Sequence, residues 1–241
     1  MLAVDERVEM DCLGRRVRLS ASSVDHEEPA TSHVVLRVKG EDREITTGPV
    51  GTARGILHQV PLIDRIDESY RMGDGTLYVG NRVEAAAGGR VLARTVAGAW
   101  EGEAYSVYAF ASGAGIDNRT IIDLFGALRI VETAAGVRVD VRNEHGGDVV
   151  EEPTVTVEQP DLGLVEMSRM TWRRQRALPR WKGTRARGGE LFRDRLADNV
   201  EYLRLVNETA FSTVLPGDGR RFNRAELRNV VRHLEIDYVD G

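Results

Sequence analysis

Apolar and polar residues alternate over much of the first half of the chain, a pattern typical of β-strands that bury one face. The alternation predicts strands over residues 16–20, 33–39 and 43–47. Residues 40–42 (Gly-Glu-Asp) favour a turn that joins the last two strands as a hairpin. We therefore expect an antiparallel sheet in this half of the protein.

A second set of predicted strands follows. Residues 77–86 and 90–96 flank Gly88-Gly89, a dipeptide that tolerates the positive φ angles of a tight hairpin turn. Residues 103–110 are rich in aromatic side chains and supply a third strand. These segments predict one sheet with a buried face.

The period of the pattern changes over residues 117–129, where apolar side chains recur at the spacing of one helix face. They are Ile121, Leu124, Phe125 and Leu128. Asp117 or Asn118 is suited to cap the first backbone amides. We expect this helix to pack against the sheet.

Strand-like alternation returns over residues 137–141, and the turn-forming residues 143–148 separate it from a further strand around Val155 and Val157. After Pro160 the pattern favours helices. The sequence as a whole shows no internal repeat and no low-complexity tract.

Two helices are predicted beyond this point. The first covers residues 190–207, with an apolar stripe of Phe192, Leu196, Val200 and Leu203. The second covers residues 224–233, where Asn223 and Glu226 resemble a capping box. A last strand is predicted over residues 235–239.

The order of elements predicts an α+β fold: an antiparallel β-rich N-terminal body with a helical C-terminal part. The predicted division is a body with one packed helix over residues 1–160, a basic arm or linker over 161–189, and a helical segment over 190–241. Because strands and helices do not alternate regularly, a Rossmann-type enzyme is not expected.

Charge is distributed unevenly along the chain. Residues 1–168 hold 28 acidic and 17 basic side chains, residues 169–195 hold two and ten, and the remainder holds eight and six. Arginine outnumbers lysine 31 to 2, a bias that we attribute to a GC-rich bacterial genome. The mildly acidic total argues against a protein that coats nucleic acid with its whole surface, but it leaves room for one basic footprint.

This basic segment also carries two tryptophans. Its candidate partner-binding residues are Trp172, Arg173, Arg174, Arg176, Arg180, Trp181, Lys182, Arg185 and Arg187. Pro179 and the glycines at 183, 188 and 189 argue against one continuous recognition helix and favour an extended arm.

Three interpretations of the arm stay open. In the leading hypothesis the protein is a noncatalytic assembly or interaction component, bacterial or phage-type, whose arm docks on a partner subunit, either a second copy or another protein. In the alternative it is a nucleic-acid-binding accessory protein, since cations neutralise phosphates and indoles stack on bases. In the third, the indoles pack on the protein's own sheet and the arginines form a solvated rim.

Catalytic motifs are absent from the sequence. No histidine lies in HExxH or at ligand spacing from another histidine or cysteine, and no serine lies in a GxSxG elbow. We expect no metal and no cofactor. A small-molecule enzyme that uses Asp64, Glu68 or His58 in a cleft stays as a further alternative, because Asp64 and Glu68 would share one face of a helix.

Two loops are weaker candidates for a binding site. A metal could bind His26, Glu27, Glu28 and His33, although Pro29 makes this segment resemble a surface loop. The glycines of GPVGTARG, residues 48–55, fit neither phosphate-loop pattern and favour a turn.

Cys12 is the single cysteine, so an intrachain disulfide is excluded, and we expect it to be a small buried side chain in a strand. No stretch reaches the roughly 18 apolar residues of a membrane span, and the first residues lack the pattern of a signal peptide. We expect a cytoplasmic protein without a membrane partner.

Overall fold

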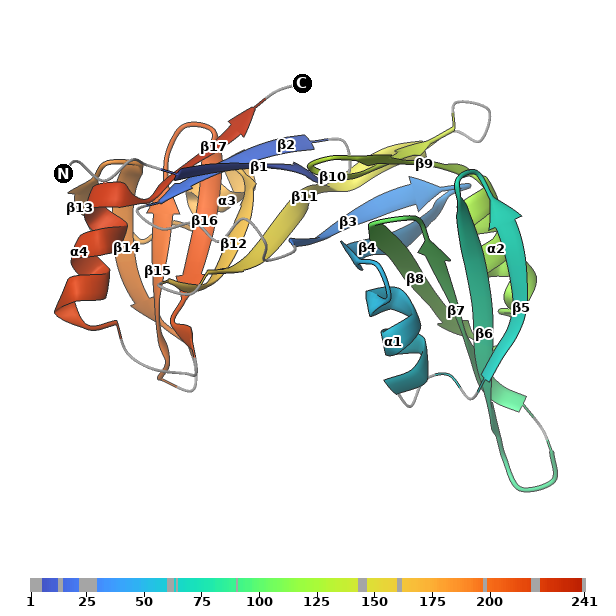
Figure 1. Ribbon diagram of the computed structural model, residues 1–241. Coiled ribbons are helices and arrows are strands. Elements are labelled where there is room, and N and C mark those ends of the chain that lie inside the picture. Colours follow the sequence, from blue (N-terminus) through green and yellow to red (C-terminus); the bar gives the residue numbers. More distant parts are fainter. Residues whose placement is uncertain are drawn as a thin grey trace. The chain divides into compact units, whose positions relative to one another are not determined.

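A computed structural model describes residues 6–12, 15–21, 30–59, 63, 65–89, 91–142, 147–159, 162–196, 199–217 and 222–239. The chain forms two compact units (Figure 1). Unit 1 combines Met1–Ala30 with Pro153–Gly241, and unit 2 is Thr31–Glu152. Strands account for 61% and helices for 16% of the described residues, and the strand pairs within each unit are antiparallel. The predicted α+β fold is therefore wrong: the protein is mostly antiparallel β.

The elements of unit 2 are β3 (Thr31–Val38), β4 (Glu41–Pro49), α1 (Thr52–Gln59), β5 (Arg65–Met72), β6 (Gly75–Ala85), β7 (Val91–Glu101), β8 (Tyr105–Gly113), α2 (Asn118–Gly126), β9 (Leu128–Thr133) and β10 (Gly136–Val141). Six of these strands pair in the order β3-β4-β8-β7-β6-β5, and β9 pairs with β10. The hairpins predicted within residues 33–47 and 77–96 are both present.

The two helices of unit 2 pack on opposite faces of β7. Successive strand residues point to opposite faces, so Ala97 and Ala99 share one face, where they join the core formed with α1. Gly98 lies on the other face, beneath Ile121 and Phe125 of α2. Of the two predicted caps, Asp117 is the N-cap of α2, and it forms a capping box with Thr120. The helix ends at Gly126 rather than at residue 129, because Leu128 already belongs to β9.

The hairpin of β6 and β7 extends beyond its neighbouring strands. Strand β5 pairs with β6 only as far as Asn81, and β8 pairs with β7 only as far as Arg94. Residues 82–85 therefore pair only with the start of β7, and beyond Arg94 the hairpin is a two-stranded ribbon (Figure 1). Gly88 and Gly89 close its turn with φ angles of 98° and 81°.

The elements of unit 1 are β1 (Glu6–Cys12), β2 (Arg15–Ala21), β11 (Gly147–Gln159, from Pro153 onward), β12 (Gly163–Arg169), α3 (Trp172–Arg176), β13 (Thr184–Ala186), β14 (Gly189–Arg195), β15 (Glu201–Val206), β16 (Ala210–Leu215), α4 (Arg224–His233) and β17 (Glu235–Val239). Six strands pair in the order β13-β14-β15-β16-β12-β11, and three pair in the order β17-β2-β1. Cys12 lies in β1, although its side chain is outside the described part.

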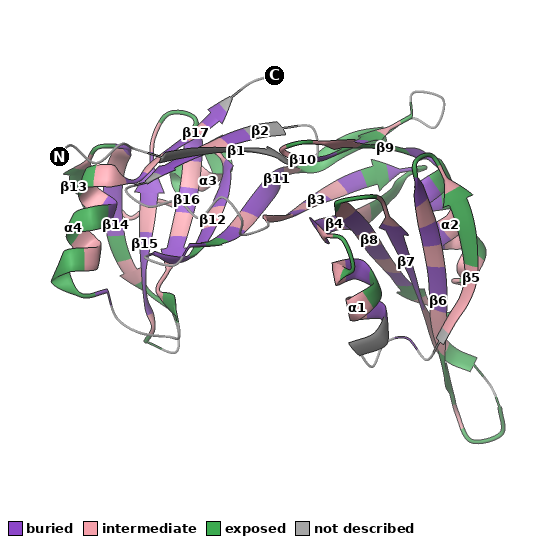
Figure 2. Ribbon diagram, in the orientation of Figure 1, coloured by how far each residue is buried: buried purple, intermediate pink, exposed green. Residues whose placement is uncertain are grey.

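The core of unit 1 lies between these two sets of strands. Val17 and Leu19 of β2 and Ile236 of β17 are buried against Leu203 and Leu205 of β15, and α4 adds Val230. Buried and partly buried residues alternate along β16 (Figure 2), as expected for a strand with one face in a core. The predicted helix and strand at residues 224–239 are confirmed, including the capping box of Asn223 and Glu226.

The predicted helix over residues 190–207 is wrong, because this segment forms the hairpin of β14 and β15. The hairpin turn follows Leu196, whose backbone N–H donates a hydrogen bond of 2.9 Å to the carbonyl of Val200. Asn199 adopts a φ of 71°, a left-handed conformation that asparagine tolerates better than most residues. The remaining C-terminal region adds β12 and β16 to the same sheet, so the predicted shift toward helix after Pro160 is also wrong.

Candidate functional site

The basic segment of the sequence connects β12 to β14 in unit 1. It forms the five-residue helix α3, a loop, and the short edge strand β13, so it is no continuous recognition helix. The Thr171 side chain caps α3 by accepting a hydrogen bond of 3.3 Å from the backbone N–H of Arg174. The N-cap thus fixes where the helix begins.

Both tryptophans of this segment face solvent. The exposed fraction is 63% for Trp172 and 57% for Trp181, whereas Trp100 is buried in unit 2. Large indoles usually bury most of their surface, so two exposed rings this close in sequence are an unusual feature. We call the exposed part of the segment the Trp/Arg surface, comprising Trp172, Arg173, Arg176, Arg180, Trp181, Lys182 and Arg185.

Two arginines of α3 lie over the Trp172 ring. The guanidinium carbons of Arg173 and Arg176 are 5.5 Å and 5.1 Å from the ring centre. Such cation–π contacts contribute about 0.5–1 kcal/mol at exposed sites. The indole therefore holds the two guanidinium groups at the protein surface and leaves their positive charges unneutralised.

Arg174 has a different role, because its side chain holds α3 on the sheet. Its guanidinium donates a hydrogen bond of 2.9 Å to the backbone carbonyl of Arg169 and one of 3.5 Å to Thr154. It also lies 5.8 Å from the centre of the Phe211 ring. These contacts occupy Arg174 within the protein.

Arg187 anchors the other end of the segment. Its guanidinium lies 3.5 Å from the Glu235 carboxylate, and its backbone N–H donates a hydrogen bond of 2.9 Å to Val231 of α4. The predicted binding residues thus divide into two anchors, Arg174 and Arg187, and an outward group formed by the other seven.

The outward group carries excess positive charge. Within the described ranges, no carboxylate lies at ion-pair distance from Arg173, Arg176, Arg180, Lys182 or Arg185. Exposed guanidinium forks bind carboxylates and phosphates in a bidentate manner, and exposed indoles supply apolar contact area. The arrangement is chemically suited to bind an anionic macromolecular surface.

Sequence reasoning missed a second group of arginine and aromatic side chains beside α3. The guanidinium of Arg204 lies 5.0 Å from the Tyr202 ring centre and 5.8 Å from that of Phe211, the ring that Arg174 also contacts. The Arg204 guanidinium also lies 3.7 Å from the Asp194 carboxylate. A strand assignment for residues 201–206 would have placed these side chains on one sheet face.

The residues of the predicted enzyme alternative do not form a described site. Glu68 lies in strand β5, so the helical pairing with Asp64 does not exist. Asp64 and the side chain of His58 lie outside the described residues. Glu68 lines a cavity of about 450 Å³ with Ile66, Asp67, Asn81 and Asn118. Its carboxylate accepts a hydrogen bond of 2.6 Å from Asn118.

The weaker candidates also find no support in the described regions. His33 lies in β3, while His26, Glu27 and Glu28 fall outside the description. The described side chains contain no group of three or more His, Cys, Asp or Glu placed to hold a metal ion. The glycine-rich turn leads into α1, where the backbone N–H of Ala53 donates to the Ser106 hydroxyl at 3.3 Å.

No helix in the described part of the chain is both long and apolar enough to cross a membrane. Comparison of the chain with protein-family models, curated proteins and solved structures found no match.

Proposed function

We propose that this chain is a noncatalytic interaction protein that docks on an acidic surface of a partner subunit through its Trp/Arg surface. The observation that carries the proposal is the exposure of Trp172 and Trp181 among cations that have no carboxylate partner within the described residues. Tryptophan and arginine are enriched among the residues that dominate binding energy at protein interfaces.

The surroundings of Trp172 favour a protein partner over a nucleic acid. A base that stacks on this indole competes with the guanidiniums of Arg173 and Arg176, which already lie over the ring. A carboxylate meets no such competition, because it binds the N–H groups of a guanidinium and does not need the ring face. Aspartate and glutamate side chains on a partner satisfy this geometry.

The first experiment measures assembly. Light scattering gives the molar mass of the purified protein, alone and with its co-purifying partner, for the wild type and for a variant with Trp172, Arg176, Arg180 and Trp181 changed to Ala. We expect the variant to lose the assembly. The matched control changes Val91, Leu92, Arg119 and Arg129 to Ala, which removes two exposed apolar side chains and two exposed arginines from unit 2. Equal masses for all three proteins contradict the proposal.

A second experiment identifies the class of partner. A photo-reactive amino acid replaces Trp181 in cells, and a matched protein carries it in place of the exposed Leu92. We expect the first protein to form a crosslink to a distinct protein, at an acidic segment identified by peptide mass spectrometry. Crosslinks to nucleic acid alone, or the same crosslinks from both positions, exclude docking through this surface.

The five cations of the Trp/Arg surface also favour a second candidate, a nucleic-acid-binding accessory protein. If each contacts one phosphate, the logarithm of affinity falls against the logarithm of salt concentration with a slope of roughly −4.5. Fluorescence anisotropy with labelled DNA and RNA measures this slope. The 260 to 280 nm absorbance ratio of the purified protein detects carried nucleic acid, and absence of binding at low salt excludes this candidate.

A further inference from the structure

A charged pocket lies at the end of the β14–β15 hairpin, on the face of the unit 1 sheet opposite to helix α3. Arg193 and Arg195 of β14 lie opposite Leu203 and Glu201 of β15. Because strand residues alternate, both arginines share the face of Leu191, which belongs to the unit 1 core. At this end of the core, charged side chains thus replace apolar ones.

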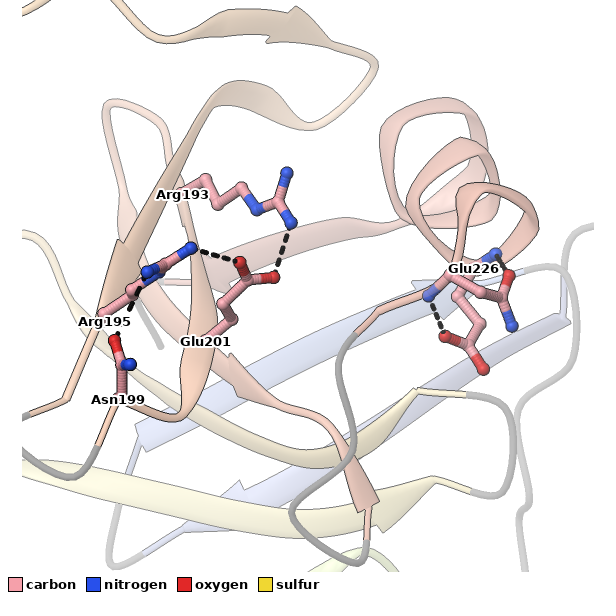
Figure 3. A network of polar contacts seen from close by, with 6 residues as sticks. Arg193, Arg195, Asn199, Glu201 and Glu226 are labelled. Carbon is pink, nitrogen blue, oxygen red and sulfur yellow. Dashed lines mark hydrogen bonds and ion pairs between the residues drawn. The ribbon is translucent and has the colours of Figure 1, made fainter.

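Glu201 holds both guanidiniums in place (Figure 3). Its carboxylate accepts a hydrogen bond of 2.5 Å from Arg193 and one of 3.1 Å from Arg195, while Arg195 also donates to Asn199 at 3.3 Å. Glu201 is only 3% exposed. Hydrogen bonds and the positive charge of Arg193 hold the pKa of Glu201 below its ordinary value, with Arg195 adding to the effect. The carboxylate therefore stays ionised and fixes the two arginines.

Among the described residues, the pocket has one positive charge in excess once Asp194 is counted as the partner of Arg204. One buried carboxylate faces two guanidiniums, whose side chains are still 55% and 52% exposed. Asp194 also lines the cavity, but its carboxylate accepts from the Tyr202 hydroxyl and the Arg195 backbone and lies beside Arg204. Neutralising Glu201 requires one arginine, so the second is not needed for charge balance.

The remaining donors of both arginines suit an anionic ligand. A guanidinium carries five N–H groups, and among the described contacts Arg193 uses one and Arg195 two. Arg193, Asp194, Arg195 and Glu201 line a cavity of about 270 Å³, slightly smaller than typical ligand pockets. We propose that this pocket binds an oxyanion, the phosphate or carboxylate group of a small molecule. Glu201 acts as the positioning residue for the two arginine forks.

This proposal is independent of docking through the Trp/Arg surface. Helix α3 is held by contacts of Arg174 with Phe211 and Thr154, which lie on the sheet face opposite to Arg193 and Arg195. Loss of the Trp/Arg surface therefore leaves anion binding intact, and failure of either proposal does not affect the other.

Isothermal titration calorimetry with inorganic phosphate and with succinate, at constant ionic strength set by potassium chloride, tests the proposal. We expect saturable binding of one or both anions to the wild type, and the anion that binds identifies the ligand class. Arg193→Ala and Arg195→Ala should each weaken binding at least about tenfold, a loss expected for a charge-assisted bidentate contact. The control Arg228→Ala removes an exposed arginine of α4 in the same unit and should leave affinity unchanged.

Three results count against the proposal, the third from lysine variants. The first is the absence of saturable binding of either anion to the wild type. The second is an equal loss of affinity in Arg228→Ala, which indicates general charge attraction. Because removal of one arginine can disturb folding around Glu201, Arg193→Lys and Arg195→Lys are measured beside the alanine variants. Lysine keeps the positive charge but lacks the paired N–H donors of a guanidinium, so we expect a folded protein with weakened anion binding. Unchanged affinity in both lysine variants counts against a site that depends on these paired donors.

Discussion

The guanidinium of Arg174 donates a hydrogen bond of 2.9 Å to the backbone carbonyl of Arg169, the last residue of β12. Arg174→Ala removes this bond and the contact with Phe211, so we expect it to lower the free energy of unfolding by about 1–3 kcal/mol. Arg180→Ala should change it by less than about 0.5 kcal/mol, because Arg180 is exposed on the same segment. Urea denaturation measures both. Equal effects would show that Arg174 is no anchor.

Gly98 is required by close packing against α2. A Cβ atom at this position would lie 2.4 Å from Ile121 and 2.7 Å from Phe125. We expect Gly98→Ala to destabilise the protein by about 1–3 kcal/mol through overpacking. Gly55 of α1 has no neighbour within 4 Å of its Cβ position, so Gly55→Ala should stabilise the protein by about 0.5–1 kcal/mol. Thermal denaturation of the two alanine variants distinguishes these opposite signs.

The three tryptophans allow a direct test of exposure. Trp100→Phe leaves fluorescence from Trp172 and Trp181, whereas the double variant with Phe at both of those positions leaves the buried Trp100. We expect acrylamide to quench the first variant several-fold more efficiently than the second, because collisional quenching requires solvent access. Similar quenching of both variants would contradict the exposed Trp/Arg surface.

Stability should depend on pH through Glu201. Its pKa is lowered in the folded protein from an ordinary value of 4.5, so its stabilising contribution is present above pH 4.5 and is lost as the pH falls through the folded pKa. Glu201→Gln lacks this titration. Urea denaturation between about pH 7 and pH 3 should show the wild type losing its advantage over the variant below pH 4.5. A difference that is constant across this range contradicts the assignment.

The sequence predicted most of unit 2 because its pattern and turns are local. The hairpin at Gly88-Gly89 and the helix capped by Asp117 depend on residues close in the chain. In unit 1, Phe192, Leu196 and Val200 have the spacing of a helical stripe, but the segment forms two strands that pair with each other and with the neighbouring strands β13 and β16. Such pairing outweighs local periodicity.

The candidate sites show the same division. Composition alone located the basic segment and its two indoles. The anchoring roles of Arg174 and Arg187 depend on Phe211 and Glu235, which are distant in sequence. The pocket at Glu201 was missed because a helix over residues 190–207 does not place this carboxylate beside Arg195, whereas an antiparallel hairpin places them directly opposite.

The ribbon of β6 and β7 has no flanking strand beyond Asn81 and Arg94, so its amide protons should exchange with solvent sooner than those of the sheet that supports it. The ribbon can also change length without altering the register of any neighbour. Its Gly88-Gly89 turn is therefore where a foreign peptide or a fluorescent label can enter unit 2 while the rest of the fold stays undisturbed.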